Sequence, residues 1–83
     1  MTKERLEQII WANPITLEIA TELIMEFCEK CIHRIPNNQE LQILLRLGQY
    51  INWNRLMCQV AELNGYQLIT ITKDNLVVAR YLQ

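Results

Sequence analysis

The chain has 83 residues, 51% of them hydrophobic, and eight Lys and Arg against nine Asp and Glu leave a net charge of −1. This length predicts a single domain over residues 1–83 with a limited core. The charge balance excludes the strongly basic surface of most nucleic-acid binders, and the apolar runs are too short to cross a membrane. So high a hydrophobic fraction favours an apolar contact surface about as much as a well-filled monomer core.

The first predicted helix follows Thr2, whose hydroxyl is a good N-cap, and stops before Asn13-Pro14, where the proline disfavours helical angles. Its apolar stripe consists of Leu6, Ile9 and Ile10. The run from Thr2 to Ile10 resembles the opening of small accessory proteins of lambda-like phages. That resemblance covers this helix alone, and it implies an accessory protein without naming an activity.

The second and longest predicted helix has Asn13 as its N-cap and Pro14 at its first position, and it runs to about Arg34 before Pro36. Its acidic residues lie toward the N-terminal end and its basic residues toward the C-terminal end, which the helix dipole favours. These charges are therefore interpreted as a solvent-exposed face of the helix. The stripe expected to be buried contains Leu17, Ala20, Leu23, Ile24, Phe27, Cys28 and Cys31.

Two further helices are predicted. One starts at Asn37, where Glu40 completes a capping box, and stops at Gly48. Its expected core contacts are Leu41, Leu44, Leu45 and Leu47. The other is capped by Asn52 and closed by Gly65. Its expected core face has Trp53, Leu56, Val60 and Leu63 at the centre and Met57 and Ala61 at the edge, with Asn54, Arg55, Cys58 and Glu62 opposite.

The end of the chain predicts a β-hairpin, because two runs rich in β-branched residues flank Lys73-Asp74-Asn75. A three-residue loop pairs Ile71 with Val77 and keeps the apolar residues on one face. A two-residue Asp74-Asn75 loop would place Ile69 opposite Arg80 and mix the faces. The three-residue loop is therefore predicted, with a buried face of Ile69, Ile71, Val77, Ala79 and Tyr81. The other face carries Leu68, Thr70, Thr72, Leu76, Val78 and Arg80.

The predicted fold is α+β and mainly α, with four helices followed by a C-terminal hairpin. This element order resembles that of a winged helix, and the resemblance implies a DNA-binding regulator as the alternative function. In that alternative, Asn54 and Arg55 would read base edges and Lys73 would lie at the wing tip. Few Lys and Arg surround these positions, so few phosphate contacts are expected.

Catalytic and metal-binding chemistry is disfavoured by the residue types present. The chain contains no Ser, a single Asp and a single His, so no catalytic triad is expected. On a helix, His33 points away from both Cys28 and Cys31, and the three cannot converge on a metal. We expect Cys28 and Cys31 to be buried and Cys58 to be accessible. No cofactor is predicted, and His33 is expected to interact with the helix end.

The sequence therefore favours a non-enzymatic interaction or regulatory protein. Helices can cover only one face of a two-stranded hairpin, which leaves the other for a protein partner or a second copy of the chain. The residues predicted to bind that partner are Leu68, Leu76, Val78 and Arg80. Three cysteines without a framework of spacings, and no signal-peptide pattern, favour a cytoplasmic location.

Overall fold

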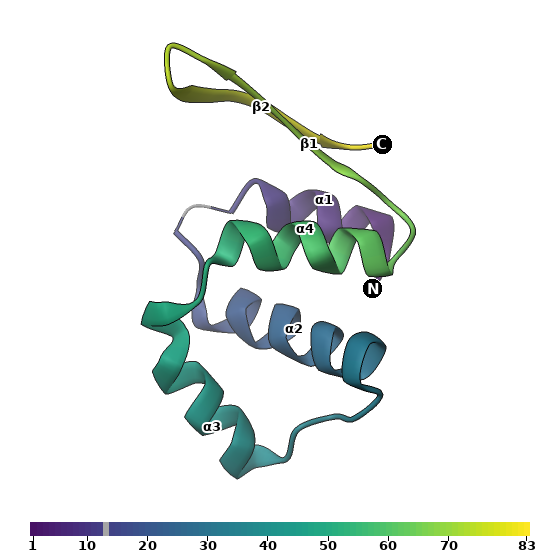
Figure 1. Cartoon of the computed structure of the whole chain (residues 1–83), viewed down its shortest axis with the longest axis vertical. Helices are drawn as coiled ribbons and strands as arrows, with labels where there is room; N and C mark the ends of the chain where they lie inside the picture. The colour runs from purple at the N-terminus through teal and green to yellow at the C-terminus, as the bar shows by residue number, and fades with distance from the viewer. Residues whose placement is uncertain (13) are drawn as a thin grey trace.

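The computed structural model describes residues 1–12 and 14–83. Within them lie four α-helices and an antiparallel hairpin, which confirms the predicted fold class and element order. The elements are α1 (Lys3–Ile10), α2 (Leu17–Phe27), a π-helical turn η1 (Cys28–Ile32), α3 (Asn38–Arg46), a 3-10 turn η2 (Leu47–Tyr50), α4 (Trp53–Leu63), β1 (Leu68–Lys73) and β2 (Leu76–Leu82). Figure 1 shows the hairpin at one end of the long axis, then α1 and α4, then α2, with α3 at the other end.

Three predicted helix starts are confirmed. The side chains of Thr2, Asn37 and Asn52 each accept a hydrogen bond from the backbone N–H three residues later, at 3.1, 2.9 and 3.1 Å. Glu40 accepts in return from the backbone N–H of Asn37 at 3.3 Å, which completes the predicted capping box. These caps satisfy donors that the first turn of a helix otherwise leaves unpaired.

The second helix is shorter at both ends than its prediction. It begins after Thr16, whose hydroxyl accepts from Ile19 N at 3.2 Å, so Pro14 is not its first helical residue. The predicted cap Asn13 lies outside the described residues. Regular α-helical geometry ends at Phe27, and the chain leaves the π-helical turn at His33, which has a left-handed φ of 60°. A π-turn is wider than an α-turn, so the stripe predicted from a 3.6-residue period no longer holds there.

The core is formed where α1, α2, α4 and the end of β2 meet. Its buried members are Leu6, Ile9, Ile10, Leu23, Met57, Val60, Ala61 and Leu82. The predicted stripe of α1 is confirmed. In α4, Met57, Val60 and Ala61 are buried, and Trp53 and Leu56 pack against the core, so these members of the predicted face are confirmed. Leu63 is 37% exposed, and Met57 and Ala61, predicted at the edge of the face, are buried, so only the centre of the face was misplaced. The reason is that α4 lies between α2 on one side and α1 with the hairpin on the other (Figure 1).

Helix α3 contributes no buried residue. Three of its predicted core leucines, Leu41, Leu44 and Leu45, are only half-buried, and Leu47 lies in η2 and is 48% exposed. The molecule extends 41 × 26 × 17 Å, and α3 occupies one end of this slab (Figure 1). A helix at the end of a slab has neighbours on one side only, which leaves much of its apolar surface in water.

The hairpin register differs from the prediction. Lys73 pairs with Leu76 and Thr72 with Val77, so the turn has two residues, Asp74 and Asn75, both with positive φ. This is the left-handed geometry that suits the twist of hairpins and that Asp and Asn tolerate. A β-bulge follows, because the next pair is Ile71 with Ala79 and Val78 is the extra residue.

The bulge changes which side chains face the helices. Beyond it Leu68 pairs with Leu82, and this pair packs against the core. Ile69 with Tyr81 and Ile71 with Ala79 therefore lie on the opposite, outer face. The prediction that Ile69, Ile71 and Tyr81 form the buried face was wrong. Because of the extra residue, Ile69 pairs with Tyr81; a two-residue loop without a bulge would have placed Ile69 opposite Arg80.

Candidate partner-binding surface

The outer face of the hairpin, defined here as Ile69, Ile71, Lys73, Leu76, Ala79 and Tyr81, is mainly apolar. Ile71 and Tyr81 are 45% and 46% exposed, and Leu76 beside the turn is 69% exposed. Ile69 and Ala79 are half-buried. The structure describes every residue of the hairpin, and Lys73 is the one charged residue of its outer face. An apolar face with so little charge is typical of a contact surface.

The two edges of the hairpin differ in regularity. Each strand pairs only with the other, so each has an edge without a strand partner in the described chain. The edge of β2 is interrupted at Val78 by the bulge, whereas Leu68–Lys73 of β1 is regular. Bulges discourage pairing with a further strand, and a regular edge permits it.

The four residues predicted to bind a partner do not lie together. Leu76 and Val78 are exposed near the turn, at 69% and 55%. Leu68 packs against the core, and Arg80 reaches toward α1 and α4. Ile69, Ile71, Ala79 and Tyr81 share one face as predicted, but that face was expected to pack against the helices, and Leu68 with Leu82 packs there instead. The Asp-Asn pair, which favours a two-residue turn, was a local signal for the observed turn.

Arg80 and Asn54 are brought together, although they were predicted for different functions. One Nη atom of Arg80 donates to the backbone oxygen of Ile10 at 2.9 Å, and the other donates to Oδ1 of Asn54. Nε of Arg80 is buried and has no hydrogen-bond partner in the described part of the chain. Beside this arginine is a cavity of about 440 Å³ whose walls include both Trp11 and Trp53.

The residues predicted to contact DNA lie on two elements, α4 and β1. Asn54 is engaged by Arg80, Arg55 is exposed on α4, and Lys73 lies next to the turn of the hairpin. Four cations have no carboxylate within ion-pair distance among the described residues. One is Arg80, which is held by Ile10 and Asn54, and the others are Arg46, Arg55 and Lys73. They come from three different elements, so they provide no concentrated positive patch.

A second apolar hollow lies between α2 with η1, α3 and α4. Its volume is about 450 Å³, and Phe27, Ile32, Leu44 and Leu56 contribute to its walls. It exists because α3 approaches α2 without burying any residue of its own. Ile32 is 58% exposed, so this hollow adds apolar surface at the end of the molecule opposite the hairpin.

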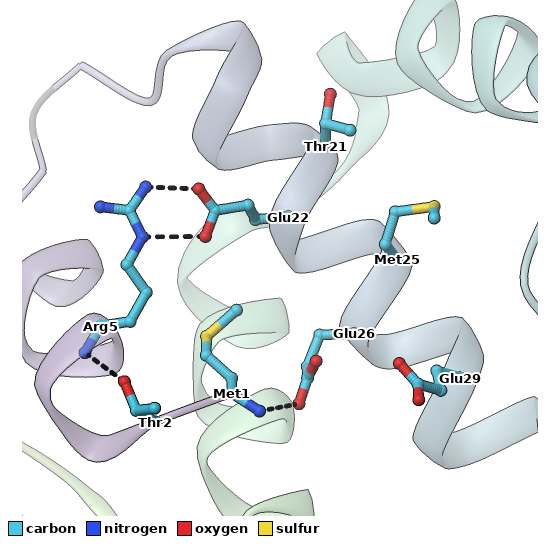
Figure 2. A pocket seen from close by; sticks show the side chains of 8 residues that line it. All are labelled: Met1, Thr2, Arg5, Thr21, Glu22, Met25, Glu26 and Glu29. Carbon is cyan, nitrogen blue, oxygen red and sulfur yellow. Dashed lines mark hydrogen bonds and ion pairs between the residues drawn. The ribbon is translucent and has the colours of Figure 1, made fainter.

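A third cavity, between α1 and α2, is explained by contacts within the fold. Figure 2 shows the guanidinium of Arg5 meeting both carboxylate oxygens of Glu22, and the N-terminal amine meeting Glu26 at 2.8 Å. The hydrogen bond with Arg5 lowers the pKa of Glu22, and the same bond raises the pKa of Arg5. These ion pairs join two helices and stabilise their packing, and Glu29, which also lines the cavity, is exposed and has no ion pair within the described residues.

The cysteines are arranged differently from the prediction. Cys31 is exposed, whereas it was predicted to be buried, and Cys28 and Cys58 are both half-buried. The π-helical turn moves Cys31 off the buried stripe of α2. Within the described residues, no group of three or more His, Cys, Asp or Glu side chains is placed to hold a metal ion.

Cys31 is therefore expected to react first with a thiol reagent. Burial raises the pKa of the Cys28 thiol, which lowers its thiolate fraction at neutral pH and slows its reaction further. Native protein treated with a maleimide should show one fast equivalent, and Cys31→Ser should abolish it. A fast equivalent that survives in Cys31→Ser and disappears in Cys58→Ser would contradict this placement.

No protein-family model matches the chain, and neither the curated proteins nor the solved structures yield a match. No helix among the described residues is both long enough and apolar enough to span a lipid bilayer.

Proposed function

We propose that the protein is a small non-enzymatic interaction module that associates with a second copy of itself through the outer face of the hairpin. The observation that carries the proposal is the exposure of Ile71, Leu76 and Tyr81 on one face of a two-stranded sheet. Covering three such side chains contributes about 1.5–3 kcal/mol each before the entropy of association is subtracted. A regulatory role in the cytoplasm belongs to this proposal, supported by three free cysteines.

A second copy suits this surface for two reasons. The outer face has a single charged side chain, Lys73, at its tip, so two copies related by a two-fold axis would meet with little repulsion. The regular edge of β1 is also self-complementary, because an antiparallel pair of identical strands satisfies the same backbone groups on both chains. A charged partner would find few complementary groups here.

The test is the mass in solution of Ile71→Asp compared with Thr72→Asp. Both positions are exposed neighbours on β1, but Ile71 lies on the outer face and Thr72 on the side that faces the helices. Light scattering should give twice the chain mass for the wild type and for Thr72→Asp. A two-fold axis places each substitution twice in the interface, so Ile71→Asp should weaken the dimer at least about a hundredfold.

Val78→Asp adds a charge at the bulge, where the side chain is 55% exposed, and it should weaken the dimer less than Ile71→Asp. Circular dichroism should show unchanged helical content in all three variants, because Ile71, Thr72 and Val78 are exposed and none of them belongs to the core. A wild-type chain that remains monomeric at high micromolar concentration contradicts the proposal.

The alternative, a winged-helix-like DNA-binding regulator, has weaker support from the geometry. Four cations have no carboxylate partner among the described residues; Arg80 is held by Ile10 and Asn54, and the other three, Arg46, Arg55 and Lys73, lie on separate elements. Electrostatic DNA binding loses affinity steeply as salt increases, whereas an apolar dimer does not. A submicromolar complex with a defined duplex, weakened by both salt and Arg55→Ala, would favour the alternative.

A further inference from the structure

A pocket lies beneath the hairpin, on the side opposite the outer face, and three separate parts of the fold form it. The end of α1 contributes Ile10 and the adjoining Trp11, the start of α4 contributes Trp53 and Asn54, and β2 contributes Val77 and Arg80. We call it the tryptophan–arginine pocket. Its volume of about 440 Å³ lies within the range of small-molecule sites, roughly 300–1,000 Å³.

The walls of the tryptophan–arginine pocket are apolar and incompletely covered. Trp11 is 61% exposed and Val77 is 55% exposed, whereas Trp53 is half-buried against the core. Indole faces accept flat aromatic groups and branched aliphatic groups well, and covering them removes apolar surface from water. The body of a fitting ligand is therefore apolar.

Arg80 supplies the polar end of the pocket. Its guanidinium is held by the backbone oxygen of Ile10 and by Oδ1 of Asn54, and both acceptors are neutral. Each Nη nitrogen has a second N–H beyond these two bonds. No carboxylate of the described residues lies within ion-pair distance of Arg80. A positioned guanidinium without a counter-ion fits the carboxylate of a ligand.

We propose that the tryptophan–arginine pocket binds a compact apolar carboxylate, with its body against Trp11 and Trp53 and its carboxylate at Arg80. A monoanion fits better than a phosphate, because Arg80 is the one cation among the residues that line the pocket. The same chemistry occurs in a free carboxylic acid and in the C-terminal residue of a peptide. This inference does not depend on the proposed dimer, because the pocket and the outer face lie on opposite sides of the hairpin.

Intrinsic fluorescence tests the proposal directly, since the only two tryptophans of the sequence both line the pocket. We would titrate the protein with 3-phenylpropionate and, separately, with the neutral 3-phenylpropionamide of nearly identical shape. The acid is expected to change the fluorescence saturably, with an affinity about tenfold higher than that of the amide, because a hydrogen bond to a charged group contributes more than a neutral one. Equal affinities, or no saturation up to the solubility limit of the acid, would overturn the proposal.

Two substitutions assign the effect to the pocket. Arg80→Gln should reduce the difference between acid and amide to about twofold or less while amide binding persists, and Arg80→Lys should retain part of it. Trp11→Ala should weaken both ligands equally, and this exposed side chain can be removed without disturbing the core, so this variant serves if Arg80→Gln does not fold. An unchanged acid preference in folded Arg80→Gln would place the carboxylate elsewhere and refute the assignment.

Two peptides with C-terminal Phe, one ending in a free carboxylate and one amidated, show whether the ligand is a small carboxylic acid or the C-terminus of a peptide. Tighter binding of the free-carboxylate peptide than of 3-phenylpropionate identifies a peptide terminus, and the reverse order identifies a small acid. Ile71→Asp should bind 3-phenylpropionate with wild-type affinity. A dimer that fails to form therefore leaves this result unchanged, and a pocket that fails to bind leaves the light-scattering result unchanged.

Discussion

Leu23→Ala is expected to lower the free energy of unfolding by about 2–5 kcal/mol. Leu23 is completely buried at the centre of α2, and it belongs to the cluster that joins α1, α4 and β2. Truncation removes its contacts and leaves a cavity that a small core cannot fill. The total stability of an 83-residue domain is roughly 4–12 kcal/mol, so this one change removes a large part of it.

The matched control is Leu17→Ala in the first turn of the same helix. Leu17 is 71% exposed, and alanine is at least as good a helix former as leucine, so the change should stay within about 0.5 kcal/mol. Urea denaturation followed by circular dichroism measures both variants. Similar losses at the two positions would mean that α2 does not present Leu23 to the core as described.

Glu26→Gln is expected to cost about 1–3 kcal/mol at pH 7, and the loss should disappear in acid. The Glu26 side chain is 11% exposed and accepts hydrogen bonds from the N-terminal amine at 2.8 Å and from Lys30 within 3.0 Å. Burial alone would raise the pKa of Glu26, but the hydrogen bonds from the amine and from Lys30 outweigh it, so the pKa is lowered.

The sign of the pH dependence follows from that lowered pKa. A carboxylate whose pKa is depressed by folding stabilises the folded state above its ordinary pKa of about 4.3, and this contribution is lost as the pH falls through the depressed value. Glu22 has a lowered pKa as well and acts in the same direction. The wild type should therefore lose stability below about pH 4.3, and Glu26→Gln should lose less over the same interval.

Urea midpoints of the wild type and Glu26→Gln at pH 7 and at pH 3 measure this effect. Glu29→Gln is the control, because Glu29 is exposed one turn later and forms no ion pair within the described residues. It should match the wild type at both pH values. If the urea midpoints of Glu26→Gln and the wild type differ as much at pH 3 as at pH 7, the ionised carboxylate is not what stabilises the fold.

The sequence by itself determined most helix starts, because capping is a local interaction. Thr2, Asn37 and Asn52 need only a backbone N–H three residues later, and the structure contains each of those hydrogen bonds. The start of α2 is the exception. Thr16 is its N-cap, two residues beyond the proline at which the prediction placed the first helical position.

The position of the hairpin also followed from the sequence, but its register did not. One residue added to a strand transfers every later side chain to the other face, and the bulge at Val78 adds that residue. Burial of Leu68 and Leu82 against α1 and α4 favours the bulged arrangement, and these partners are distant in the sequence. The grouping of Ile69, Ile71, Ala79 and Tyr81 on one face was predicted, but which face of the hairpin the helices cover, and with it the tryptophan–arginine pocket, could not be predicted.

Burial on the helices was decided by the tertiary structure. A helical period identifies the side chains that share a face, but it does not show whether another element covers that face. Leu44 in α3 and Val60 in α4 both lie on predicted apolar faces, yet Leu44 is half-buried and Val60 is completely buried. The difference arises because α4 packs between two layers of the fold, whereas α3 lies at the end of the molecule, where other elements adjoin it on one side (Figure 1).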